Sequence, residues 1–110
     1  MYILKKTQNP QSLEISFDYF ESIHPLGPFG DIITEYARIS GVKPVEVDFL
    51  FNFKFSENGW KIQFYWNNGF TIYVFLFGRA QYQLVYERLS RICSDLNRQL
   101  AEKRYLSKKQ

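Results

Sequence analysis

The chain has 110 residues, of which 45% are hydrophobic and 19% aromatic, and a formal net charge of +3. This length predicts one domain over residues 1–110, and a charged fraction of 23% is typical of a folded chain rather than a disordered one. The longest apolar run is about eight residues, well short of the ~20 of a membrane span. A single cysteine, Cys93, excludes a disulfide framework and a multi-cysteine zinc site. We therefore expect a cytoplasmic protein that does not enter a membrane.

The basic residues are concentrated in the last third of the chain. Residues 1–78 hold six Lys and Arg against eight Asp and Glu, whereas residues 79–110 hold eight against three. Such an asymmetry indicates either an anionic partner or a solvated end. We expect residues 107–110 to form a frayed basic tail.

The N-terminal part of the chain predicts one strand and one short helix. Apolar and polar side chains alternate over residues 13–20, which indicates a strand with one face in the core. Prolines and glycines then predict a loop over residues 24–30. Asp31 is a suitable N-cap for a helix that reaches about Ser40 and stops at Gly41.

Residues 45–77 predict an antiparallel meander of three strands. The first strand, residues 45–55, alternates regularly, and its predicted core face is wholly apolar: Val45, Val47, Phe49, Phe51, Phe53 and Phe55. This alternation indicates a core face for the whole segment.

Two turns compete after this strand. A four-residue loop would place Lys54 opposite Lys61, and like charges in that position are unfavourable. A two-residue type I′ turn at Asn58-Gly59 pairs Phe55 with Ile62 instead. We favour the two-residue turn.

Two registers are open for the last strand, residues 70–77, because the turn at residues 67–69 can have two or three residues. A three-residue turn with a left-handed Gly69 pairs Trp66 with Phe70 and points the even-numbered side chains to the core. A two-residue turn shifts the pairing by one residue and moves every side chain to the other face. In both registers an apolar stripe lies on the second face of the sheet.

Residues 79–106 predict a long helix, about 42 Å at 1.5 Å per residue. Its apolar stripe has helical spacing and consists of Val85, Leu89, Ile92, Leu96 and Leu100. A ten-residue strand is only about 33 Å long, so we expect this helix to overhang the sheet. The predicted fold class is α+β: a three- to four-stranded antiparallel sheet containing the meander 45–77, a short helix before it, and the long C-terminal helix packed on it.

No pattern in the sequence indicates catalysis. His24, the only histidine, lies in a proline-rich loop, and Cys93 lies beside the apolar stripe of the long helix, where a buried inert thiol is usual. Glu46 and Asp48 share a predicted strand face, where two solvated carboxylates are commoner than a catalytic pair. The sequence contains no phosphate loop and no zinc-binding motif. We expect a protein that is not an enzyme and that holds no metal and no cofactor.

We expect the second face of the sheet to bind protein. If both helices pack on the core face, an aromatic-rich set stays exposed: Leu50, Tyr65, Tyr73, Phe75 and Phe77. An aromatic patch with a charged rim is typical of protein interfaces. The sequence thus predicts a non-catalytic interaction module, such as an adaptor, inhibitor or assembly factor, whose partner is another protein or a second copy in a homodimer. The alternative is a monomer in which the N-terminal segment or the long helix covers this face.

Nucleic acid is the alternative partner. The basic end of the long helix would then contact phosphates through Arg98, Lys103, Arg104, Lys108 and Lys109. A helix end that is simply solvated would account for the same basic residues equally well. A small ligand between sheet and helix is a further alternative, which no sequence pattern singles out.

Overall fold

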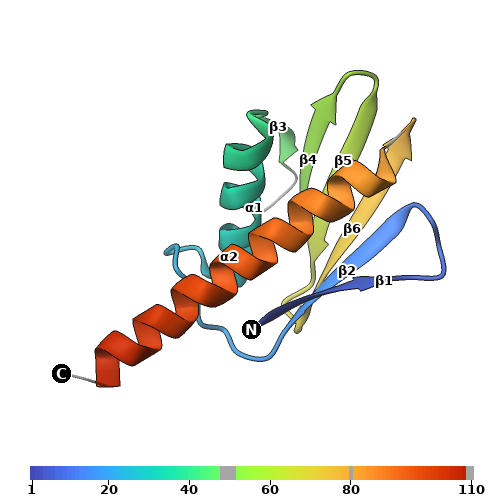
Figure 1. Ribbon diagram of the computed structural model, residues 1–110. Helices are drawn as coiled ribbons and strands as arrows, with labels where there is room; N and C mark the ends of the chain where they lie inside the picture. Colours follow the sequence, from blue (N-terminus) through green and yellow to red (C-terminus); the bar gives the residue numbers. More distant parts are fainter. Residues whose placement is uncertain (48–51, 80, 109–110) are drawn as a thin grey trace.

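The computed structural model describes residues 1–47, 52–79 and 81–108. Over these residues six strands and two helices form an α+β fold (Figure 1). The elements are β1 (Tyr2–Lys6), β2 (Ser12–Phe17), α1 (Gly27–Ser40), β3 (Pro44–Val47), β4 (Asn52–Glu57), β5 (Trp60–Trp66), β6 (Thr71–Gly78) and α2 (Tyr82–Lys108). The strands form one antiparallel sheet in the order β1-β2-β6-β5-β4-β3. The predicted fold class is confirmed.

The sheet is wider than the predicted three to four strands. β1 is an additional edge strand, and its lysine-rich sequence gives no clear alternation. The prediction of a single strand over residues 45–55 is wrong, because β3 and β4 pair antiparallel and the chain reverses between Val47 and Asn52. A single strand of that length would run past Trp66 at the end of its partner β5 and leave backbone groups unpaired.

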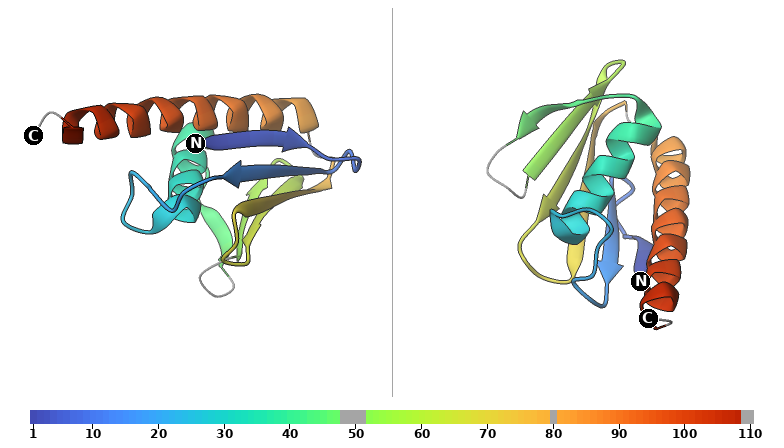
Figure 2. Two further views of the ribbon diagram at one scale, coloured as in Figure 1. Left: turned by 90° about the horizontal axis from the view of Figure 1, so that it is seen from below. Right: turned by 90° about the vertical axis from the view of Figure 1, so that its left-hand side faces the viewer.

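Both helices pack on the same face of the sheet (Figure 2, right). Alternate residues of β6, namely Ile72, Val74 and Leu76, are buried beneath them. The Tyr36 ring of α1 packs 5.0 Å from Phe55. β1 and β2 extend the sheet sideways and do not cover its second face (Figure 2). The fold therefore has two layers, and its core lies between the sheet and the two helices.

Helix α1 begins before the predicted N-cap, Asp31. Its first turn contains Gly27 and Pro28, and proline is tolerated there because a first-turn N–H has no partner within the helix. The predicted stop is confirmed, since Gly41 is left-handed (φ 73°) and its N–H donates to the carbonyl of Ala37. Asp31 is not a cap but a buried residue inside the helix.

The turn between β4 and β5 is the predicted type I′ turn. Asn58 and Gly59 both have positive φ, 37° and 86°. Phe55 pairs with Ile62, so the predicted register is confirmed.

The turn between β5 and β6 is longer than either predicted alternative. Trp66 pairs with Ile72 rather than with Phe70, and the left-handed residue is Asn68 (φ 68°) rather than Gly69. The pairing differs by two residues from the three-residue turn, and a shift of two leaves every side chain on the same face. The even-numbered residues of β6 therefore face the core. The Trp66 indole N–H donates to the carbonyl of Gly69 (2.8 Å) and closes the longer loop.

A side chain of α2 covers part of the free edge of β1. The Oδ1 atom of Asn97 accepts a hydrogen bond from the Tyr2 backbone N–H (2.6 Å), and its Nδ2 atom donates to the Tyr2 carbonyl (2.9 Å). A side-chain amide offers the same donor and acceptor as a peptide group. Asn97 thus takes the place of a neighbouring strand at an edge that would otherwise be open to other chains.

The C-terminal end of α2 extends beyond the sheet (Figures 1 and 2). Leu100 is buried, whereas residues 101–107 are exposed. The helix spans Tyr82–Lys108, which is two to three residues further along the chain than predicted at each end. Residues 109–110 lie outside the described part, and the frayed tail stays a prediction. Neither described helix has the length and apolarity that a membrane crossing requires.

Candidate interaction surface

The sheet face opposite the helices carries a row of aromatic side chains. Tyr73, Phe75 and Phe77 alternate along β6, and Tyr65 of β5 pairs with Tyr73 at a ring-centroid distance of 6.4 Å. Phe77 is 46% exposed and Tyr65 is 40% exposed, while the other two are half-buried. We call these four residues the aromatic row. The structure brings together these four predicted interface residues, and the fifth, Leu50, lies outside the described residues.

The two sides of the aromatic row differ in charge. Lys61 of β5 lies opposite Phe77 in the strand register. On the other side, Glu14 of β2 lies opposite Tyr73, and Lys5 of β1 lies opposite Glu14. The β5 side is therefore cationic, whereas the β2 side carries a carboxylate next to the row.

The predicted nucleic-acid contacts lie on α2, but the described ones are engaged within the chain. Three contacts involve them: Arg98 with Glu102 (3.3 Å), Lys103 with the carbonyl of Ser22 (3.0 Å), and Arg104 with Glu21 (2.8 Å). The Lys108 side chain and all of Lys109 lie outside the described part. A cation that already has a partner must exchange it before it can bind a phosphate. Two of these contacts fasten the loop before α1 to the overhanging end of α2.

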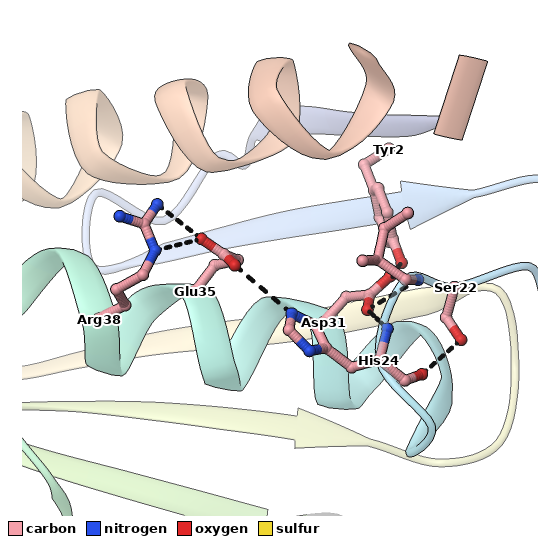
Figure 3. A network of polar contacts seen from close by, with 7 residues as sticks. Tyr2, Ser22, His24, Asp31, Glu35 and Arg38 are labelled. Carbon is pink, nitrogen blue, oxygen red and sulfur yellow. Dashed lines mark hydrogen bonds and ion pairs between the residues drawn. The ribbon is translucent and has the colours of Figure 1, made fainter. Parts of the chain in front are cut away.

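Asp31 joins three segments of the chain at one buried carboxylate (Figure 3). It accepts hydrogen bonds from the Tyr2 hydroxyl (2.7 Å) and from the backbone N–H groups of Ile23 (3.1 Å) and His24 (2.7 Å). Burial, together with the hydrogen bond and charge of Asp31, raises the pKa of Tyr2 far above its ordinary value. The Tyr2 hydroxyl therefore stays a neutral donor, and the carboxylate attaches both β1 and the loop to α1.

A histidine, a glutamate and an arginine lie beside Asp31 (Figure 3). His24 Nε2 is 3.4 Å from Glu35 Oε1, and Arg38 is 2.7 Å from the other carboxylate oxygen. A histidine paired with a carboxylate also occurs in hydrolase triads, where the ring faces a nucleophile. Here the Ser22 hydroxyl donates to the backbone carbonyl of His24 (2.8 Å). The contacts of His24, Glu35 and Ser22 thus hold the loop before α1 in place.

A partly buried ion pair joins α2 to the hairpin of β4 and β5. Arg88 donates two hydrogen bonds to Glu57 (2.6 and 3.2 Å) and a third to the Tyr36 hydroxyl (3.2 Å). Two parallel bonds of this kind are the strongest arginine–carboxylate arrangement. The hydrogen bond to Glu57 raises the pKa of Arg88, and burial raises the pKa of Tyr36 to about 12. Sequence reasoning missed this pair, because its members are 31 positions apart and no local spacing connects them.

Cys93 is buried among the apolar residues of α2. Burial raises the pKa of its thiol to about 12, and a thiol that stays protonated is a weak nucleophile. The predicted burial of Cys93 is confirmed. Across the described ranges, no group of three or more His, Cys, Asp and Glu side chains is placed to hold a metal ion.

Comparisons with protein families, curated proteins and solved structures found no match to this chain. The aromatic row and its surroundings are therefore the features on which a function can be proposed.

Proposed function

We propose that this protein is a non-catalytic interaction module that binds protein through the aromatic row. The supporting observation is that both helices pack on the other face, which leaves Phe77 46% and Tyr65 40% exposed. Large aromatic side chains contribute much of the binding energy of protein interfaces. They cost free energy when they are left in water, because burying apolar area is favourable.

We further propose that the partner is a second copy of the chain. A dimer with a two-fold axis along β6 would stack the two aromatic rows face to face. That rotation places the β5 side of one copy over the β2 side of the other and keeps each residue at its level along β6. Glu14 of each copy then lies over Tyr65 of the other, whose hydroxyl can donate to the carboxylate. A self-complementary patch of this kind is what a two-fold dimer requires.

The experiment is a mass measurement by light scattering behind size exclusion, at low and high salt and at high protein concentration. We expect a dimer at both salts, because apolar contacts provide most of the affinity. Phe77→Glu should give a monomer, since the two-fold axis along β6 brings the two copies of residue 77 together and the variant places two carboxylates there. A wild-type chain that stays monomeric under all these conditions overturns self-association.

Leu26→Glu is the matched control. Leu26 is 78% exposed and does not lie on the sheet face, so this variant adds the same charge elsewhere and should remain a dimer. A paired substitution tests the two-fold geometry. Tyr65→Phe alone and Glu14→Gln alone should each weaken the dimer, and the two together should weaken it little more than either one, because both remove the same contact.

Nucleic acid is less well supported as the partner. Arg98, Lys103 and Arg104 each have a partner within the chain. Binding of single-stranded RNA that weakens steeply with salt, and that is lost in Lys103→Ala with Arg104→Ala, would favour this alternative over the protein interface.

A further inference from the structure

A pocket of about 330 Å³ opens on the helix side of the sheet, between α1 and the strands β4 and β5. Phe29, Ile33 and Thr34 of α1 form one wall, and Phe53 of β4 and Trp66 of β5 form the other. The pocket is on the face opposite the aromatic row. It is therefore a separate place on the molecule, and it does not depend on the proposed function.

The walls of the pocket are aromatic and held in position. The Phe29 ring centroid is 5.6 Å from that of Phe53 and 5.9 Å from that of Trp66, with edge-to-face and tilted geometries. The indole N–H of Trp66 already donates to the carbonyl of Gly69. The Trp66 ring therefore presents its apolar surface to the pocket, and the walls do not depend on a ligand for their shape.

Among the described residues that line the pocket no side chain carries a charge. Their polar side-chain groups are the Trp66 indole N–H, which is bonded to Gly69, and the Thr34 hydroxyl. A charged ligand would lose its hydration there without gaining a partner. The lining thus selects for an uncharged, mainly apolar ligand. The Thr34 hydroxyl can donate one hydrogen bond to the ligand or accept one from it.

Gly30 and Leu26 lie at the mouth of the pocket. Gly30 occupies the interior of α1, where glycine is otherwise unfavourable. A Cβ atom added to Gly30 would lie 2.5 Å from the Cβ atom of Leu26. The missing side chain therefore lets Leu26 approach the helix at the pocket rim, where Leu26 remains 78% exposed.

We propose that this pocket binds one small uncharged molecule that carries an aromatic ring or an aliphatic chain. Its volume lies within the range of small-molecule sites, roughly 300–1,000 Å³. Its walls come from a helix and two strands, which are regular elements of the fold. Uncharged aromatic walls with a single hydroxyl are the composition that recognises such a molecule.

The experiment measures binding of N-phenylnaphthylamine, a neutral fluorescent probe, to the full chain. We expect saturable binding with a dissociation constant on the order of 100 µM, typical for a ligand of this size without charged contacts. Decanol should displace the probe, whereas decanoate at a pH where it is ionised should need at least a tenfold higher concentration. In a ¹⁵N-labelled sample, the amide signals of Gly30 and Thr34 and the indole signal of Trp66 should shift.

Thr34→Phe fills the pocket from an exposed helix position, and we expect it to weaken probe binding at least tenfold. Ser94→Phe is the matched control, because it adds the same ring at an exposed position of α2 away from the pocket. Leu26→Trp is a second way to fill the mouth if Thr34→Phe does not fold. Absence of saturable binding, or equal binding by wild type and both filling variants, overturns the proposal. Equal displacement by decanol and decanoate overturns the selection for uncharged ligands.

Discussion

Substitutions of Asp31 test how β1 and the loop are attached to α1. The carboxylate is fully buried and accepts hydrogen bonds from the Tyr2 hydroxyl and from two backbone N–H groups. Asp31→Leu keeps a similar volume but removes the acceptors, so it leaves one buried and two partly buried donors without partners, at about 1–3 kcal/mol for a fully buried one. Because the site partly relaxes, we expect the free energy of unfolding to fall by about 4 kcal/mol.

Asp31→Asn should be much milder. The remaining side-chain oxygen can continue to accept from the backbone N–H groups of Ile23 and His24. The new amide then faces the Tyr2 hydroxyl, which can rotate to accept a hydrogen bond where it previously donated one. We expect a loss of about 1–2 kcal/mol, which is the difference between charged and neutral hydrogen bonds.

Tyr2→Phe decides whether this reasoning is right. In the wild type it removes one hydrogen bond to a charged group and should lower the free energy of unfolding by about 1.5 kcal/mol. In the Asp31→Leu background it removes a hydroxyl that has lost its partner, so it should raise that free energy by about 1 kcal/mol. Urea denaturation followed by tryptophan fluorescence measures all four values. If Tyr2→Phe destabilises both backgrounds equally, the hydroxyl is not bonded to Asp31 and the reasoning is refuted.

Three further predictions concern the core and the hairpin. Stability should fall as the pH rises from about 9 to 12, because burial raises the pKa of Cys93 and of Tyr36 to about 12. The stabilising contribution of such a group is complete below its unfolded-state pKa and is lost as the pH rises to its folded-state pKa. Urea midpoints across this range measure the slope, which Cys93→Ala should flatten; an unchanged slope contradicts the assignment. Gly59→Ala should cost about 1 kcal/mol in urea denaturation, because φ is 86° there, and no loss would mean that the turn adapts freely. Arg88→Met should cost about 2–3 kcal/mol by leaving the Glu57 carboxylate partly buried and unpaired, and adding Glu57→Leu should recover part of that loss in thermal unfolding; a further loss would argue against the pair.

Local patterns predicted the parts of the fold that local forces decide. The alternation around Ile62 and the Asn58-Gly59 turn fixed both the register and the core face of the first hairpin, because one backbone geometry satisfies both. Gly41 likewise marked the end of α1, because the left-handed backbone at that position (φ 73°) favours glycine. The alternation of β6 predicted that Tyr73, Phe75 and Phe77 share one face of the sheet, although two registers were open for this strand.

The remaining features depend on contacts between distant parts of the chain. Alternation over residues 45–55 continues through a chain reversal, so it does not distinguish one long strand from two shorter ones. Asp31 is of a residue type that commonly caps helices. Its role as a buried acceptor depends on Tyr2, which lies 29 positions away in the sequence. The pocket was equally hidden, because its walls combine Phe29 with Trp66 from a strand far along the chain.

The contact between Asn97 and Tyr2 has a consequence for the order of events during synthesis. These residues are 95 positions apart, so a ribosome makes β1 long before it makes the side chain that protects its edge. Until α2 emerges, the growing chain also lacks the buried residues that cover the sheet, among them Leu89 and Leu96. Because β6 joins β2 to β5, the sheet is complete only once residue 78 has been made, and α2 follows directly in the sequence. The nascent chain therefore folds late, when α2 leaves the exit tunnel.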